Sequence, residues 1–242
     1  MQPFSFSALN KKGVLYLIPN SLGSGAEAFA TELSRKVVSE TSTFIVEEIK
    51  SARKLLRALC IEGPLERFDY FNLNEHTKSH ELEQMLEPML LGKNVGLISE
   101  AGVPCVADPG SSVVALAHEN GVKVVPLSGP SSIIMALMAS GFNGQEFTFN
   151  GYLPREKGDR QKKIRSMEQL AQKGHTQIFM DAPYRNNQVL EDLLQTCRME
   201  TKLCIAKNIS LHDEIIITKD ITGWHMKKPD LNKQPVMFIL GK

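Results

Sequence analysis

Side chains able to take part in chemistry follow the ends of predicted strands in this sequence. Residues 95–98 form an uninterrupted apolar run, typical of a strand buried on both faces, and Ser99 and Glu100 follow it directly. A second buried strand is predicted at 122–126, ahead of the small residues 128–132. A carboxylate such as Glu100 can bind hydroxyl groups or accept a proton. The small residues let the backbone approach a ligand and offer it free N–H groups.

The elements around these residues indicate an α/β fold. The pattern becomes helical at 111–120 and 131–140, where Met135 and Met138 are expected in the core. Strand, turn, helix and strand in this order are typical of a parallel sheet, whose ligands bind at the carboxyl ends of its strands. We therefore predict an N-terminal domain with a parallel sheet at 1–126 and a C-terminal domain with a mixed sheet at 127–242. Further predicted strands are 14–19, 43–47, 68–73, 147–152, 176–180, 203–206, 214–218 and 235–240, and further helices are 51–59, 80–91, 163–173 and 185–196.

Composition places the chain among ordinary globular proteins. Of its 242 residues, 42% are hydrophobic and 23% are charged, and the net charge is +1. This balance excludes neither nucleic acid nor a neutral ligand, so any basic surface must be local. The four cysteines have no metal-ligand spacing and suggest no disulfide framework, and no metal is predicted. No secretory segment and no apolar run of about 18 residues is present, so we expect a cytoplasmic protein without a membrane partner.

Three motifs resemble the tetrapyrrole methylase family of S-adenosylmethionine (SAM) methyltransferases. They are SEAGVPCVADPG at 99–110, PLSGPSSIIMALMASG at 126–141 and FNGYLPREKG at 149–158. The nearest branch methylates a cytidine ribose 2′-hydroxyl in 16S ribosomal RNA and has S-D-A-G-x-P-x-x-x-D-P-G, P-G-P-S and F-x-G-F-L-P in the same order. The resemblance extends from residue 14 to residue 240. It implies two α/β domains with a SAM-binding cleft between them, as in class III methyltransferases.

The resemblance also implies which residues form the site. The SAM contacts would come from the two small-residue turns and from two later strand ends: Ser99, Ala101, Gly102, Val103, Pro104, Ser128, Gly129, Pro130, Ser131, Met180, Asp181 and Ala206. A basic run at 155–165 occupies the place of a similar run in the rRNA branch and predicts phosphate contacts. The expected RNA-binding residues are Lys50, Arg155, Lys157, Arg160 and Arg185. The resemblance further implies a homodimer acting on ribosomal RNA or the 30S subunit.

The chemistry of methyl transfer leaves several alternatives open. A ribose hydroxyl needs a general base, for which Glu100, Glu47 and Lys207 are the candidates. Asp108 either faces a ligand or closes the turn before the next helix. The loops departing from the rRNA branch, such as Ile49-Lys50 in place of Thr-Arg, leave two other functions open. These are methylation of a small molecule such as a tetrapyrrole precursor, and non-catalytic binding of SAM or RNA.

Overall fold

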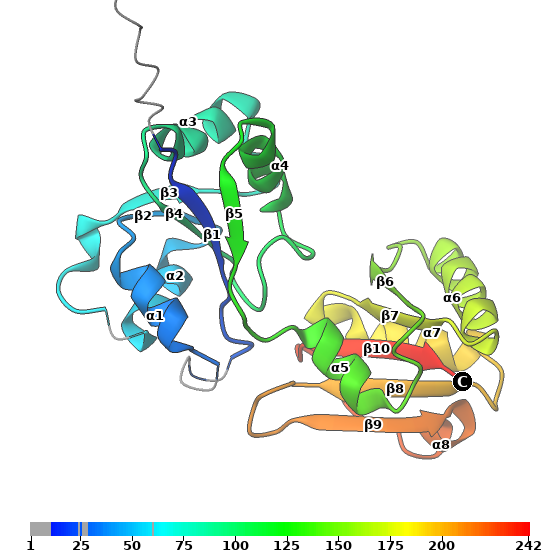
Figure 1. The fold of residues 1–242 in the computed structure, drawn as a ribbon. Coiled ribbons are helices and arrows are strands. Elements are labelled where there is room, and N and C mark those ends of the chain that lie inside the picture. Colours follow the sequence, from blue (N-terminus) through cyan, green and yellow to red (C-terminus); the bar gives the residue numbers. More distant parts are fainter. Residues whose placement is uncertain (1–10, 24, 26–28, 60) are drawn as a thin grey trace, which may run out of the picture. The chain divides into compact units, whose positions relative to one another are not determined.

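The structure is a computed structural model, and it describes residues 11–242 apart from 24, 26–28 and 60. The chain divides into two compact units, one ending at Pro130 and the next beginning at Ser131 (Figure 1). The boundary expected from sequence, after residue 126, lies slightly earlier. Leu127 still belongs to the first unit because its N–H donates to Leu17 O at 3.0 Å. Cys60 lies outside the described residues, and the three described cysteines are free thiols.

The first unit is a parallel sheet with helices on both faces (Figure 1). Its strands lie in the order β3-β2-β4-β1-β5. Helices α1 and α2 pack on one face around Phe44 and Leu56, and α3 and α4 pack on the other around Leu15 and Met89. The elements are β1 (Val14–Ile18), α1 (Glu32–Ser39), β2 (Thr43–Val46), α2 (Ile49–Ala58), the 3-10 turn η2 (Leu65–Arg67), β3 (Asp69–Asn72), α3 (Ser79–Leu90), β4 (Val95–Ile98), α4 (Ser111–Glu119) and β5 (Lys123–Pro126).

The second unit has a mixed sheet in the order β6-β7-β10-β8-β9. Only β6 and β7 run parallel, and β10 and β9 pair antiparallel with their neighbours. The main core, around Phe179 and Phe238, lies under α6, α7 and α8, while α5 contacts β8, β9 and β10. The elements are α5 (Ser132–Ser140), β6 (Phe147–Tyr152), α6 (Lys157–Gln172), β7 (Thr176–Met180), the turn η3 (Pro183–Arg185), α7 (Asn186–Thr196), β8 (Lys202–Lys207), β9 (Ile215–Asp220), α8 (Ile221–Met226) and β10 (Val236–Gly241).

The α/β fold and both sheet types agree with the sequence analysis, and several details differ. Strand β4 is buried throughout, but β5 is not, because it is an edge strand with exposed ends at Lys123 and Pro126. Met138 is 78% exposed, so its assignment to the core was wrong. Helix α6 begins six residues before the predicted start, at Lys157 instead of 163. Helix α8 was not predicted; Asp220 caps it by accepting the Gly223 N–H at 2.7 Å.

Among the described residues, none of the helices has the length and apolar character needed to cross a membrane.

Candidate active site

The first sheet has a topological switch point between the ends of β1 and β4. The two strands are neighbours, but α1 after β1 packs on one face of the sheet and α4 after β4 packs on the other. Loops that leave neighbouring strands in opposite directions leave a crevice at the carboxyl end, which is where parallel sheets bind ligands. The two loops are bridged here, because the Asn20 N–H donates to Gly102 O at 2.8 Å.

Asn20 is the residue that joins the loops around the switch point. Its side-chain Nδ2 donates to the backbone oxygens of Ser99 and Glu100, at 3.1 and 2.9 Å, and to Ser51 Oγ at 3.2 Å. Only 6% of Asn20 is exposed, so these bonds are shielded from water. The sequence analysis did not identify Asn20, whose signal was an amide directly after the apolar run 14–19.

Two of the predicted general bases lie side by side at this edge. Glu47 follows β2 and Glu100 follows β4, and the Glu100 N–H donates to Glu47 Oε1 at 3.2 Å. Burial raises the pKa of Glu47, opposed by that hydrogen bond and assisted by the charges of Asp108 and Glu100. A carboxylate of raised pKa is a better proton acceptor than an ordinary one. The third candidate, Lys207, belongs to the second unit, at the end of β8.

Asp108 closes the turn between β4 and α4. Its Oδ1 accepts the N–H groups of Cys105 and Gly110, both at 2.8 Å. Cys105 and Ala107 adopt left-handed backbone conformations, with φ of 68° and 63°, which such an Asp-closed turn supports. Of the two readings of Asp108, the turn-closing one is therefore present in the structure. Burial, and secondarily the Asp108 charge, raises the pKa of the Cys105 thiol to about 11.

A polar hollow of about 570 Å³ opens beside this turn. It lies between the loop after β3 and the turn before α4, and polar side chains form most of its wall: Asn74, Glu75, Thr77, Asp108, Ser111 and Ser112. Asp108 Oδ2 is buried and has no hydrogen-bond partner. The first unit therefore holds an open space beside the Asp108 turn.

The two small-residue turns have the shape and the free backbone groups that a cofactor needs. Gly102 has a φ of 71°, and a Cβ there would lie 3.4 Å from Leu22 Cδ2 and 3.5 Å from Pro130 O. Among the described residues, the N–H groups of Ala101, Ser128 and Gly129 have no protein acceptor. Such groups fit the polar ends of SAM. Gly129 has a packing reason as well, since a Cβ would come within 2.1 Å of Pro19 Cβ.

The other residues predicted to contact SAM in the first unit surround these glycines. Ser99 is buried, and its Oγ donates to Gly102 O at 3.0 Å, which tightens the turn. Ala101 and Ser128 are exposed, Pro104 is buried, and Val103 and Pro130 are half-buried, as is Ser131, the first residue of the second unit.

In the second unit, the predicted SAM residues Met180 and Ala206 lie on β7 and β8, the two strands that flank β10. Met237 of β10 pairs with Met180 of β7 on one side and with Ala206 of β8 on the other. Asp181 follows Met180; its Oδ1 accepts the Ala182 N–H at 2.7 Å and faces Arg185 Nη1 at 3.2 Å. Burial raises the pKa of Asp181, whereas the hydrogen bond and the two nearby arginines lower it. Its Oδ2 is buried without a hydrogen bond.

The predicted RNA-binding residues separate into buried and exposed groups. Arg160 is buried: its Nε and Nη2 bind Asp192 Oδ2 at 2.7 and 2.6 Å, and its Nη1 donates to the carbonyls of Pro154 and Arg155. Arg185 Nη2 also donates to Pro154 O, at 3.0 Å. These two arginines hold the chain ahead of α6. Arg155, Lys157 and Lys50 are exposed to solvent.

Comparison with known proteins finds one matching family and relatives that share one name. The family model of the tetrapyrrole (corrin/porphyrin) methylases matches residues 15–222. The ribosomal RNA small subunit methyltransferase I of Vibrio cholerae is 30% identical over 86% of this chain and 68% of its own. The proteins of the same name from Bacillus subtilis and Escherichia coli O157:H7 are both 29% identical, over 91% and 97% of this chain and 73% and 79% of theirs.

Solved structures show the same fold at low identity. The methyltransferase CobJ superposes with a TM-score of 0.63 and 17% identity, over 95% of this chain and 94% of its own. The uroporphyrin III C-methyl transferase from Thermus thermophilus has a TM-score of 0.56 and 18% identity, over 95% and 98% of the two chains.

Proposed function

Because this chain belongs to the tetrapyrrole methylase family, and is thus a SAM-dependent methyltransferase, we propose that it methylates small-subunit ribosomal RNA. The observation that carries the proposal is the shared name of its relatives, which match at 27–30% identity across most of the chain. The acceptor we propose is a ribose 2′-hydroxyl of 16S ribosomal RNA. The protein would act as a cytoplasmic homodimer on the 30S subunit, in keeping with the family that its motifs resemble.

The carboxylates of the first unit supply the base that this acceptor requires. When bound, SAM provides a methyl group on a sulfonium, which is transferred by in-line displacement. A ribose hydroxyl attacks well only as its proton leaves. Glu47 is the group we assign to accept that proton, because burial raises its pKa and Glu100 N–H fixes its Oε1 at 3.2 Å. Glu100 is exposed and adjacent, and it is suited to bind the neighbouring hydroxyl.

SAM would be held by backbone groups and small side chains. We assign the adjoining N–H groups of Ser128 and Gly129, and the tight turn at Gly102, to its polar atoms. Met180, Asp181 and Ala206 are the proposed contacts from the second unit. Alignment of two reactants in a site of this kind contributes much of the rate of a displacement reaction.

The RNA would be bound through exposed cations. Arg155 and Lys157 precede and begin α6, where Arg160 and Arg185 fix the backbone. Exposed side chains on a fixed backbone can bind phosphates without a large loss of entropy. Lys50 at the start of α2 is a further proposed phosphate contact. Arg160 and Arg185 would act by positioning this segment.

The test is methyl transfer to 30S subunits that lack the modification. The protein, tritiated SAM and subunits are incubated, and the RNA is digested to nucleosides to identify the methylated atom. We expect a 2′-O-methylated nucleoside and, by calorimetry, micromolar binding of SAM. Ser128→Trp, at an exposed position, should weaken SAM binding, whereas Gly129 is unsuitable because any side chain would collide with Pro19.

Two results would contradict the proposal. Transfer to a tetrapyrrole precursor but not to 30S subunits would favour the small-molecule reading. Binding of SAM without transfer to either acceptor would favour a non-catalytic role. As a control for folding, Ser39→Trp places the same side chain at an exposed position at the far end of α1 and should leave SAM binding unchanged.

A further inference from the structure

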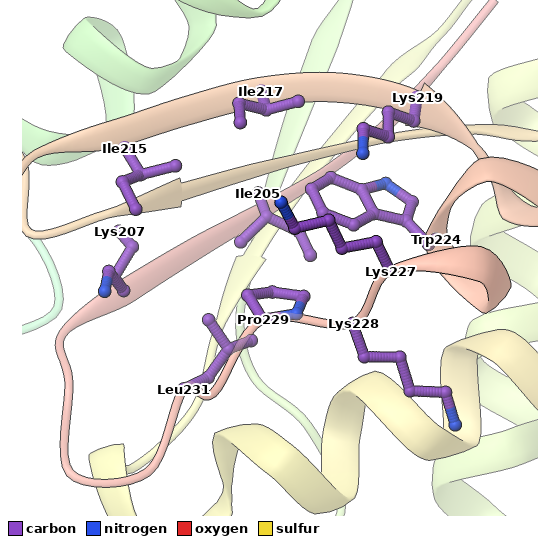
Figure 2. Close-up of a pocket in the computed structure, with 10 residues that line it drawn as sticks. All are labelled: Ile205, Lys207, Ile215, Ile217, Lys219, Trp224, Lys227, Lys228, Pro229 and Leu231. Carbon is purple, nitrogen blue, oxygen red and sulfur yellow. The ribbon is translucent and has the colours of Figure 1, made fainter.

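The second unit contains a groove that the proposed chemistry does not use. It has a volume of about 230 Å³ and lies between the β8–β9 hairpin and the segment 227–231 that follows α8. Figure 2 shows its ten lining residues: six are apolar and the other four are all lysines. Lys207 and Lys219 lie on the hairpin wall, and Lys227 and Lys228 lie on the opposite wall (Figure 2).

The floor of this lysine groove is apolar and rigid. Trp224 is 3% exposed, and its Nε1 donates to Leu203 O at 2.9 Å, which anchors α8 to the sheet. Ile215 and Ile217 of the edge strand β9 are 39% and 41% exposed, and they face the groove opposite Pro229 (Figure 2). Apolar side chains left accessible in a hollow favour a ligand with an apolar face.

Of the four lysines that line the groove, only one forms an ion pair within the described part of the chain. Lys228 forms an ion pair with Glu191, at 2.7 and 3.0 Å. Within the described ranges, Lys207, Lys219 and Lys227 make no ion pair, and Lys219 Nζ lies 5.0 Å from the centre of the Trp224 ring. The charge of Lys207 acts on Asp230, which already accepts hydrogen bonds from Asn187 and the Asn232 N–H.

We propose that the lysine groove binds a single-stranded segment of RNA, with a base on Ile215, Ile217 and Pro229 and with phosphates on Lys207, Lys219 and Lys227. The charge complementarity supports this occupant, because cations on both walls require a ligand that is anionic along its length. The apolar floor requires a flat apolar group between the charges, and a nucleotide chain combines the two. A duplex hides its base faces and would not fit. The inference rests on the proposed function only in taking RNA as the substrate.

A membrane surface fits less well. Lipid-binding surfaces place apolar side chains where they protrude beyond the cations. Here Ile215 and Ile217 line a hollow, with lysines on both of its walls. The geometry is therefore that of a site for a narrow chain.

The experiment compares variants of the full-length chain by fluorescence anisotropy with a labelled twelve-nucleotide single-stranded RNA. The Lys207→Gln/Lys227→Gln double variant should reduce the slope of log affinity against log salt by about 1.4, at about 0.7 per phosphate lost on a single strand. Ile217→Ser should weaken binding about fivefold or more with the slope unchanged, because it removes base contact alone. The matched control is Lys173→Gln/Lys202→Gln, which removes two exposed lysines outside the groove and should change neither quantity.

Parallel measurements separate this proposal from the proposed function. If the unchanged protein methylates 30S subunits while both groove variants bind RNA normally, the groove proposal is overturned and the proposed function stands. If the groove variants lose RNA binding but the protein methylates no RNA, the groove proposal stands and the proposed function fails. Tighter binding of anionic vesicles than of RNA would overturn the groove proposal. A change from dimer to monomer on Ile217→Ser, seen by sedimentation, would also overturn it.

Discussion

The two units hold their functional side chains by different physical means. At the sheet edge of the first unit, a neutral amide, Asn20, joins loops through short hydrogen bonds to backbone oxygens. In the second unit, charged side chains hold the chain: Arg160 is buried against Asp192, and the half-buried Arg185 pairs with Asp181. A neutral amide fixes small-residue turns without adding charge beside Glu47 and Glu100. Buried guanidinium groups fix a backbone segment whose exposed neighbours remain positive.

This difference indicates a division of tasks. The first unit presents carboxylates and bare backbone, which suit proton transfer and cofactor binding. The second unit presents exposed cations, on the 155–165 segment and in the lysine groove, which suit a polyanion. Changes at the carboxylates of the first unit should therefore alter catalysis, and changes at the exposed cations of the second should alter RNA affinity.

Of the changes considered, removal of the proposed base should have the largest effect, and it should act on kcat. Glu47→Gln keeps the shape of the side chain but cannot accept a proton, and we expect kcat to fall by about 10²- to 10⁴-fold. SAM affinity, measured by calorimetry, should stay the same. Glu83→Gln, at an exposed position on α3, is the matched control and should leave kcat unchanged.

The same base predicts a pH dependence of known sign. Because burial raises the pKa of Glu47, the acidic limb of kcat/KM should have its midpoint above that of an ordinary glutamate. Activity is lost as the pH falls through that value, since the protonated carboxyl cannot accept a proton. Glu47→Gln should abolish this limb. A limb that persists in the variant would assign the titration to another group.

Breaking the buried ion pair should unfold the second unit more readily. Arg160→Met leaves the buried Asp192 with only Lys157, whose Nζ lies 4.0 Å from its Oδ1, and should lower the free energy of unfolding by about 3–5 kcal/mol. The measurement is denaturant unfolding followed by the fluorescence of Trp224, the one tryptophan of the sequence, which reports on this unit. Arg165→Met, on an exposed face of α6, is the matched control and should lower the free energy of unfolding only slightly. A loss below about 1 kcal/mol for Arg160→Met would count against the assigned role of the pair.

Loss of the amide in the first unit should have a smaller, local effect. Asn20→Ala removes the donor to the Ser99 and Glu100 carbonyls, at a cost of about 1–3 kcal/mol. Hydrogen exchange of the peptide 95–105 should become about tenfold to hundredfold faster. Asn72→Ala is the control: it removes two exposed hydrogen bonds, one donated to Glu47 O and one accepted from Asn74 Nδ2. Equal acceleration in both variants would show that Asn20 has no special role.

The smallest expected effect is on the reactivity of Cys105. Burial, then the charge of Asp108, raises its pKa to about 11, so little thiolate exists at pH 8. Asp108→Asn keeps the Oδ1 acceptor for the turn but removes the charge, which lowers the pKa. Iodoacetamide labelling at pH 8, followed by mass spectrometry of the Cys105 peptide, should become about two- to fivefold faster. If the variant is labelled no faster than the unchanged protein, the Asp108 charge does not affect the pKa of Cys105.

Local sequence patterns by themselves determined most of the elements of this protein. Strands at 95–98, 147–152 and 176–180 have the predicted bounds, because β-branched, aromatic and aliphatic residues between turns favour a strand without reference to the rest of the chain. The motifs at 99–110 and 126–141 likewise identified the family, since tight turns beside a ligand restrict residue types at fixed spacing.

Only the tertiary structure decided which polar residues meet. Asn20 contacts Ser99 and Glu100 across about eighty residues of sequence, and Arg160 is buried against Asp192, although it lies in a run of charges that reads as exposed. Lys207 lines a groove with Lys219 and Lys227 for the same reason, because the pairing of β8 with β9 and the position of the segment after α8 bring them together. Local composition carries no information about such contacts, since a buried ion pair and a solvated one use the same residue types.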